Sequence, residues 1–178
     1  PMFHEASVLE HTARVMDGSF GDTLGVWMAL CHDLGKTATR PEFLPHHHGH
    51  EEIGADMAGS LAARLRLPNR LRLAGRLAAR WHMAAGRFAD LRPSTRVRLL
   101  LELDKAGMME SFFRTVAADQ GGDHLERARG ERAVRKSVRL PEKHRDQGPK
   151  SADILLQLRC EALREGRDKP GGGPGEGS

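Results

Sequence analysis

The apolar residues of this chain are mostly helix formers, and this feature limits its fold more than any other. Aromatic residues make up only 4% of the sequence and tyrosine is absent, so a core has to be built from Leu, Ala, Val and Met. Leu, Ala and Met favour helix, and alternating runs of Val, Ile or Thr that would indicate a sheet are nearly absent. We therefore predict an all-α fold, a helical bundle whose 178 residues suit a single domain.

Apolar side chains spaced three to four residues apart, with capping residues before them, mark the expected helices. These helices cover about residues 8–18, 23–33, 50–67, 69–83, 93–104, 108–119 and 151–165. Gly35 is expected to stop the second helix, and Ser151 to cap the last. The third helix is expected to bury a stripe made of Ile53, Met57, Leu61 and Leu65.

Composition divides the chain after Gly121-Gly122, where a charged segment poor in apolar residues begins. We expect a core over residues 1–121 and a C-terminal charged segment with a helix over 122–165. Residues 166–178 are rich in Gly and have little to bury, so we expect a disordered tail.

Net charge and cysteine usage limit the kinds of partner and the cellular compartment that suit this chain. The net charge of +4 suits a phosphate-bearing partner. Cys31 and Cys160 fit neither a disulfide framework nor a zinc-finger spacing, and no apolar run approaches the ~20 residues that span a bilayer. We expect a cytoplasmic protein without a membrane segment, and the start at Pro1 rather than Met suits a fragment of a longer enzyme.

A His-Asp pair stands at the end of an apolar helical run, in the stretch Leu30 to Lys36. Imidazole nitrogen and carboxylate oxygen are ordinary ligands of catalytic metals, so His32 and Asp33 can reach one divalent ion. Two ligands do not hold a metal, and His11 and Asp104 on other expected helices are candidates for the rest. Such a site leaves positions for water and substrate, and it suits phosphoester hydrolysis by a metal-activated water.

Lys36, His50 and His82 are further candidates for catalytic roles. Lys36 could neutralise a phosphate oxygen. His50 and His82 could ligate a second metal, or act as acid and phosphate-contacting groups around a single one. The residues alone leave both alternatives open.

Simpler interpretations exist for these residues. His11 could be a hydrogen-bonded core histidine, Asp104 a helix-end residue, and Lys36 a partner of the helix dipole. The loop histidines and the arginines of the fourth helix could be plain surface (His46, His47 and His48; Arg72, Arg76 and Arg80). The coincidence of four candidate ligands with helical context favours the metal site.

The chain resembles the HD region of bacterial multifunctional CCA-adding enzymes, tRNA nucleotidyltransferases of the HD superfamily. The resemblance rests on His11-Thr12, Ala29 to Lys36, Leu44 to Glu51, Arg64 to Asn69, Leu91-Arg92-Pro93 and Asp104, and more weakly on Gly148 to Ile154. It implies an HD-domain helical bundle with a metal site between helices. In this resemblance His32, Asp33 and His82 match functional positions, and His11 and Asp104 match outer metal ligands.

The resemblance also implies an activity and partners. It predicts a metal-dependent phosphohydrolase, with 2′,3′-cyclic phosphodiesterase, 2′-nucleotidase and phosphatase activities, acting on nucleotides or tRNA 3′ ends. Nickel, manganese, cobalt and magnesium all fit the mixed ligand set. Alternatives are a stand-alone HD nucleotidase or signalling-nucleotide hydrolase, and a non-catalytic tRNA-binding scaffold that uses Arg72, Arg76 and Arg80.

Two departures from the family pattern matter. Where the family has His-Asp, this chain has His82-Met83. The chain also lacks the Gly-Gly-x-x-Arg-Asp run of the polymerase half, so we expect no nucleotidyltransferase activity from it alone, and a missing N-terminal nucleotidyltransferase region would be a natural partner.

Overall fold

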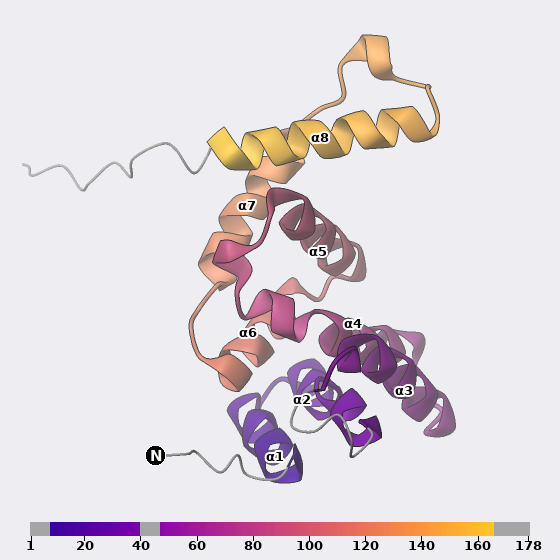
Figure 1. Ribbon diagram of the computed structural model, residues 1–178, viewed down its shortest axis with the longest axis vertical. Coiled ribbons are helices and arrows are strands. Elements are labelled where there is room, and N and C mark those ends of the chain that lie inside the picture. Colours follow the sequence, from indigo (N-terminus) through magenta and orange to yellow (C-terminus); the bar gives the residue numbers. More distant parts are fainter. Residues whose placement is uncertain (1–7, 40–46, 166–178) are drawn as a thin grey trace, which may run out of the picture. The chain divides into compact units, whose positions relative to one another are not determined.

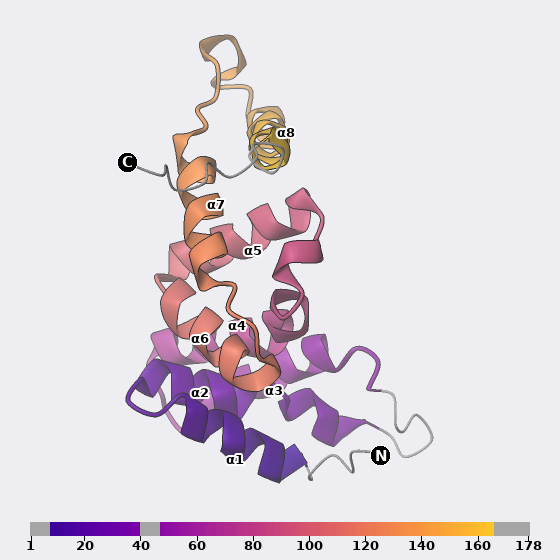
Figure 2. The ribbon, with the colours of Figure 1, turned by 90° about the vertical axis from the view of Figure 1, so that its left-hand side faces the viewer.

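The computed structural model describes residues 8–39 and 47–165, and these residues form helices and turns without a strand (Figures 1 and 2). The α-helices are α1 (Val8–Gly18), α2 (Thr23–Cys31), α3 (His50–Arg64), α4 (Asn69–Ala85), α5 (Pro93–Ala106), α6 (Met109–Gln120), α7 (Leu125–Ser137) and α8 (Pro149–Glu165). Short 3-10 turns are η1 (Leu34–Ala38), η3 (Phe88–Asp90) and η4 (Glu142–His144). The predicted all-α fold is confirmed, and the expected tail lies outside the described residues.

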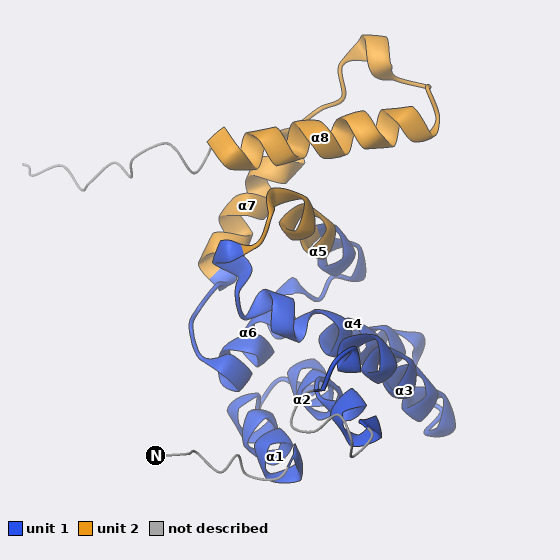
Figure 3. Ribbon diagram, in the orientation of Figure 1, with its two compact units in different colours: residues 1–90, 101–125 blue, residues 91–100, 126–178 orange. Residues whose placement is uncertain are grey.

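The chain divides into two compact units (Figure 3). The first comprises residues 1–90 and 101–125, and the second residues 91–100 and 126–178, so α5 is shared between them. The first unit contains every predicted site residue. The expected functional division into residues 1–121 and 122–165 stays a prediction.

Small residues build the interface between α3 and α4 in the first unit. The buried residues of the two helices are mainly glycine and alanine (Gly54, Ala55, Ala58, Gly59 and Ala62; Ala74, Gly75, Ala78 and Ala79). Such side chains allow two helices to approach closely and to hold the residues at their ends in fixed positions. The expected inner stripe of α3 was therefore wrong, because Ile53 and Leu65 are 45% and 56% exposed.

Helix α2 packs against α4 and α6 and carries the His-Asp pair at its end. Asp22 caps its N-terminus by accepting hydrogen bonds from the backbone N–H groups of Leu24 and Gly25. The indole N–H of Trp27 donates to the carbonyl oxygen of Leu71 in α4 over 2.7 Å. The end of α2 is thus fixed against the helix that carries His82.

Gly35 was expected to stop α2, and this prediction was wrong. The helix ends at Cys31, and Gly35 lies in η1, where the backbone passes directly against the first turn of α3. A Cβ atom at Gly35 would overlap the carbonyl oxygen of His50 and lie 2.8 Å from the backbone nitrogen of Gly54. Glycine is needed here for close approach between two backbones.

Replacing Gly35 with Ala should lower the free energy of unfolding by about 2 kcal/mol, the usual cost of overpacking. It should also weaken metal binding, because α3 and His50 must move away. Urea unfolding and metal titration check both effects. Gly130→Ala is the matched control, since a Cβ atom there meets nothing within 4 Å. An unchanged unfolding midpoint for Gly35→Ala would contradict the packing argument.

The second unit is organised by α7 and α8 (Figure 3). Arg96 is fully buried and donates to the Glu131 carboxylate over 2.6 Å. The predicted cap of the last helix was wrong: α8 begins at Pro149. Instead, the Ser151 hydroxyl accepts from the backbone N–H of Gln147 and donates to the carbonyl oxygen of His144, which holds the preceding turn. None of the described helices has the length and apolarity needed to cross a membrane.

Candidate metal centre

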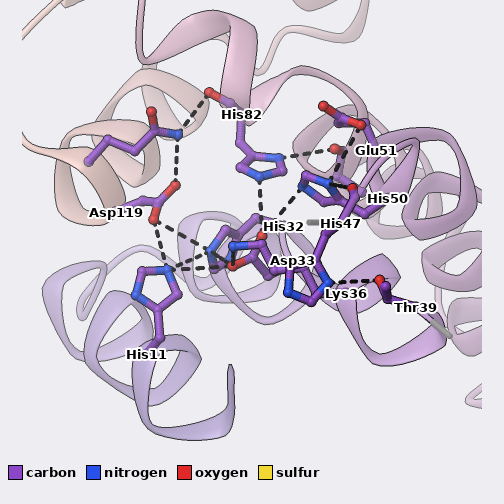
Figure 4. A network of polar contacts seen from close by, with 12 residues as sticks. His11, His32, Asp33, Lys36, Thr39, His47, His50, Glu51, His82 and Asp119 are labelled. Atoms are coloured by element: carbon purple, nitrogen blue, oxygen red, sulfur yellow. Dashed lines mark hydrogen bonds and ion pairs between the residues drawn. The ribbon is translucent and has the colours of Figure 1, made fainter. Parts of the chain in front are cut away.

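Asp33 lies at the centre of a buried polar cluster (Figure 4). Its Oδ2 atom is 2.8 Å from Lys36 Nζ, 3.3 Å from His32 Nε2 and 3.6 Å from His11 Nε2. The carboxylate is 2% exposed, so these groups rather than water surround it. One oxygen of the Asp33 carboxylate therefore lies close to two imidazoles and one ammonium group.

The other oxygen of Asp33 faces two further histidines. Its Oδ1 atom is 3.2 Å from His82 Nε2 and 3.9 Å from His50 Nε2. His82 comes from α4 and His50 from the first turn of α3. Because these helices meet through small residues, the two imidazoles converge on the turn after α2.

Among the described residues, two groups of three are therefore able to hold a metal ion. In each group the ligand atoms lie within 4.8 Å of one another, and Asp33 belongs to both. The first group adds His11 and His32, and the second adds His50 and His82. One carboxylate thus lies between two candidate positions for a metal.

The backbone sets the tautomers of three of these histidines. Nδ1 of His32, His50 and His82 lies 2.6, 2.7 and 3.0 Å from the carbonyl oxygens of Ala29, His47 and Ala79. A carbonyl oxygen only accepts, so each Nδ1 carries a proton, and a neutral ring then directs the Nε2 lone pair toward Asp33. Histidines that bind metals in proteins are commonly oriented in this way, by an acceptor bonded to the ring nitrogen that does not face the metal.

Within the part of the chain that the structure describes, three buried atoms of the second group have no hydrogen-bond partner: Asp33 Oδ1, His50 Nε2 and His82 Nε2. All three are acceptors when the rings are neutral, so they cannot satisfy one another. Buried acceptors without donors are costly, and a divalent cation satisfies them all. The donor set therefore fits a metal ion.

Charge within the cluster shifts the pKa values strongly. Burial alone would raise the pKa of Asp33, but the imidazoles of His32 and then His82 at its oxygens, the charge of His32 and the Lys36 ammonium group hold it well below its usual range. Burial would lower the pKa of His32, yet the carboxylates of Asp119 and Asp33 raise it to about 9. Without metal, His32 is thus an imidazolium between two carboxylates at neutral pH.

This proton makes the stability of the metal-free protein depend on pH. The pKa of His32 rises from 6.5 to about 9 on folding, so its stabilising contribution is complete below pH 6.5 and is lost as pH rises through 9. The loss is on the order of 3 kcal/mol. Thermal unfolding in chelator between pH 6 and 10 should show it in the wild type and in His124→Gln, but not in His32→Gln. A flat wild-type profile would contradict the assigned imidazolium.

Asp119, at the end of α6, is the carboxylate that lies against His11 and His32, the two outer histidines of the cluster (Figure 4). Its Oδ1 atom is 2.9 Å from His11 Nε2 and 3.6 Å from His32 Nε2. Burial alone would raise the pKa of Asp119, but the hydrogen bond and charge of His32 lower it by more than burial raises it. The pKa of Asp119 is therefore below its usual value. Sequence reasoning missed this residue.

The structure does not bring Asp104 into the cluster. Asp104 lies in α5, is partly exposed and belongs to neither metal-capable group. Asp104 and Asp119 each lie at the end of an expected helix, so the order of residues along the sequence fits either one as the remote carboxylate of the site. The signal that separates them is tertiary: α6 packs against α1 and α2, which carry His11 and His32.

The remaining predicted residues lie at the edge of the cluster. Lys36 is 23% exposed and bonds to Asp33, so its ammonium group lies between the buried carboxylate and solvent. His47 lies 2.7 Å from the Thr39 hydroxyl through Nδ1, and its carbonyl oxygen orients His50. Met83, which replaces an expected carboxylate, is 39% exposed and belongs to neither group. His46 lies outside the described residues.

His11 differs from the other three histidines in its tautomer. Arg14 Nη2 donates to His11 Nδ1 over 2.9 Å, so the proton of a neutral ring is on Nε2, facing Asp119. Holding a metal through Nε2 therefore requires the other tautomer of His11 and the loss of the bond from Arg14, which is exposed. The first group needs a local rearrangement that the second does not.

Comparison with known proteins gives a family match and several relatives. The HD domain family model matches residues 8–109, a range that ends before Asp119. The multifunctional CCA protein of Halorhodospira halophila is 32% identical over 184 residues, covering 93% of this chain and 44% of that protein. That of Thioalkalivibrio sulfidiphilus is 37% identical over 122 residues, covering 67% and 29%. That of Legionella pneumophila is 42% identical over 92 residues, covering 52% and 22%.

The chain spans less than half the length of these curated relatives. No solved structure gives a significant match. The family match includes the His32-Asp33 pair together with His11, His50 and His82. The chain belongs to the HD domain family.

Proposed function

We propose that this protein is a metal-dependent phosphohydrolase. The observation that carries the proposal is the position of Asp33 between two histidine groups, with Nδ1 of three histidines fixed by backbone carbonyls. This arrangement presents Nε2 lone pairs and a carboxylate to a divalent cation, which would polarise a phosphoryl group and make bound water more acidic. Nickel, manganese, cobalt and magnesium remain candidates for the cation.

The roles of the chain's own residues follow from their positions. Asp33, His50 and His82 would hold one cation, and His11 and His32 with Asp33 would hold a second. In the metal-free protein the Asp119 carboxylate lies 2.9 Å from His11 Nε2 and 3.6 Å from His32 Nε2, which places a further anionic group beside these two candidate ligands. The exposed edge of the Lys36 ammonium group is suited to bind a phosphate oxygen, since a lysine presents a compact point charge.

We further propose nucleotides or RNA 3′-terminal phosphates as substrates, with tRNA 3′ ends as the specific case. The support is the relationship to multifunctional CCA proteins, together with the resemblance of the sequence motifs to tRNA nucleotidyltransferases. The non-catalytic tRNA scaffold is less well supported, because Arg76 pairs with Asp56 at 3.0 Å and Arg80 with Glu52 at 3.3 Å. These pairs reduce the positive charge of α4 on which that alternative relied.

The test is an assay of chelator-treated protein on 2′,3′-cyclic AMP and 2′-AMP, with nickel, manganese, cobalt or magnesium added back. We expect hydrolysis only with metal, and its loss in the double variant His50→Ala/His82→Ala. A control variant, His124→Ala, removes a histidine outside the cluster and should retain activity. Hydrolysis that survives chelation, or that survives in the double variant, would contradict the proposal.

A further inference from the structure

Gln120, the last residue of α6, makes two hydrogen bonds at the cluster that the proposed function does not use. Its Nε2 atom donates to the carbonyl oxygen of His82 over 3.1 Å and to Oδ2 of Asp119 over 3.0 Å. Both partners are acceptors, so the nitrogen of the amide, and not its oxygen, faces them. One amide group therefore connects His82 of the second group with the carboxylate that lies against the first group.

The bond to Asp119 determines which oxygen of that carboxylate faces the histidines. Asp119 Oδ1 is 2.9 Å from His11 Nε2 and 3.6 Å from His32 Nε2. A carboxylate that rotates freely exchanges its two oxygens, but Oδ2 is held by the Gln120 amide. The direction in which Asp119 presents Oδ1 is therefore set by its neighbour in α6.

The bond to His82 fixes the amide itself to the end of α4. The carbonyl oxygen of His82 accepts from the backbone N–H of Gly86 over 2.9 Å, and its second lone pair accepts from Gln120. Gln120 belongs to α6, whereas His82 belongs to α4. The orientation of Asp119 thus depends on α4, the helix that supplies a candidate ligand to the second group.

Gly86 provides the space that the Gln120 side chain occupies. A Cβ atom at Gly86 would overlap Gln120 Oε1 and lie 2.5 Å from Gln120 Cδ, and the three nearest atoms outside its own stretch of chain all belong to Gln120. The φ angle of Gly86 is −62°, an ordinary helical value, so glycine is needed here for space and not for backbone conformation. The amide therefore lies where a side chain at this position would be.

We propose that Gln120 is a positioning residue of the metal centre, which holds Asp119 toward the histidines of the first group and ties it to α4. The inference rests on the proposed function only in that the cluster binds a divalent cation. A carboxylate that is already held in one direction loses less freedom when the cation binds. Removal of groups that orient metal ligands commonly weakens metal binding 10- to 100-fold. Gln120 lies outside residues 8–109, the range of the family match.

A purely structural link between α4 and the end of α6 is the competing interpretation, and His124 offers a matched control. The His124 ring donates through Nε2 to the carbonyl oxygen of Gly86 over 3.0 Å, so it also ties the segment after α6 to the end of α4. His124 lies outside the cluster. Loss of either tie should lower stability, but only the loss of Gln120 should reach the metal ligands.

Calorimetric manganese titration of the chelator-treated full chain tests the proposal. Gln120→Ala removes both bonds, and Gly86→Ala displaces the amide while leaving Gln120 in the chain. Each should weaken manganese binding about tenfold. The double variant should bind as weakly as either single variant, because both changes remove the same contact. His124→Gln should bind manganese as the wild type does.

Three titration results would overturn the proposal. The first is wild-type affinity in Gln120→Ala. The second is an additive loss of about a hundredfold in the double variant, which would show that the two changes act independently. The third is an equal loss in His124→Gln, which would show that any loosening of the end of α4 has the same effect.

Nitrogen NMR of the histidine rings in the metal-free protein gives a second readout that needs no cation. Gln120→Ala and Gly86→Ala should shift the Nε2 signals of His11 and His32, because the carboxylate beside them moves. The Nε2 signal of His50 should stay in place and serves as an internal control. Unshifted signals of His11 and His32 in both variants would overturn the proposal.

The proposed function and this inference fail separately. Wild-type protein that binds manganese but hydrolyses neither 2′,3′-cyclic AMP nor 2′-AMP would contradict the proposed function, while the affinities and ring signals of the variants still decide this inference. A metal-dependent wild-type hydrolase whose Gln120→Ala variant binds manganese with wild-type affinity would contradict this inference alone.

Discussion

Replacing Asp33 with Asn is expected to abolish divalent-metal binding and to slow phosphoester hydrolysis about a thousandfold. Asparagine keeps the shape but loses the charge that both histidine groups share. A metal acting as a Lewis acid contributes several kcal/mol, and about 4 kcal/mol corresponds to three orders of magnitude in rate. Calorimetric metal titration and the cyclic AMP assay measure the two losses.

The control for this variant is Asp17→Asn, which removes the same charge from an exposed position of α1. It should bind metal and hydrolyse substrate as the wild type does. Circular dichroism checks that Asp33→Asn remains folded. Wild-type hydrolysis by a folded Asp33→Asn protein would show that the cluster is not the centre of the chemistry.

Asp119→Asn should weaken metal binding strongly, whereas Asp104→Asn should leave it nearly unchanged. Asp119 accepts from His11 over 2.9 Å and helps to raise the pKa of His32 to about 9, so its loss disturbs both outer histidines. We expect Asp119→Asn to weaken metal affinity 10- to 100-fold or more, the usual effect of removing a group that orients or joins the ligands. Asp104→Asn should stay within about threefold of wild type, because Asp104 belongs to neither group.

This pair of variants decides between the structural and the sequence-based assignment of the remote carboxylate. Both are Asp to Asn changes in the first unit, and both positions lie on a helix. Steady-state hydrolysis at several metal concentrations separates a loss of metal affinity from a loss of turnover. A strong defect in Asp104→Asn alone would restore the ligand set that the sequence predicted.

Local patterns predicted the fold class and the His-Asp pair because both depend on neighbouring residues. The helices follow from apolar spacing and capping, and the motif around His32 and Asp33 lies within one short stretch. The convergence of His50 and His82 depends instead on close packing of α3 and α4 through glycine and alanine. Such small residues give a weak periodic signal, which explains why Ile53 was wrongly expected in the core.

Asp119 and Gly35 show what sequence spacing does not contain. Asp119 reaches the site because α6 packs on α2, a contact between elements about 90 residues apart that no local pattern encodes. Gly35 was expected to end a helix, since glycine often does so. Its actual constraint is the backbone of α3 lying against it, which only the tertiary structure reveals.

The most direct test of the metal centre is an anomalous difference map from a crystal grown with manganese. We expect a peak between Asp33, His50 and His82, with a second peak near His11 and His32 if two ions bind together. The same crystal of Asp33→Asn should show neither peak. Manganese bound only outside the Asp33 cluster, for example at the loop histidines, or no bound manganese at saturating concentration, would contradict the central claim.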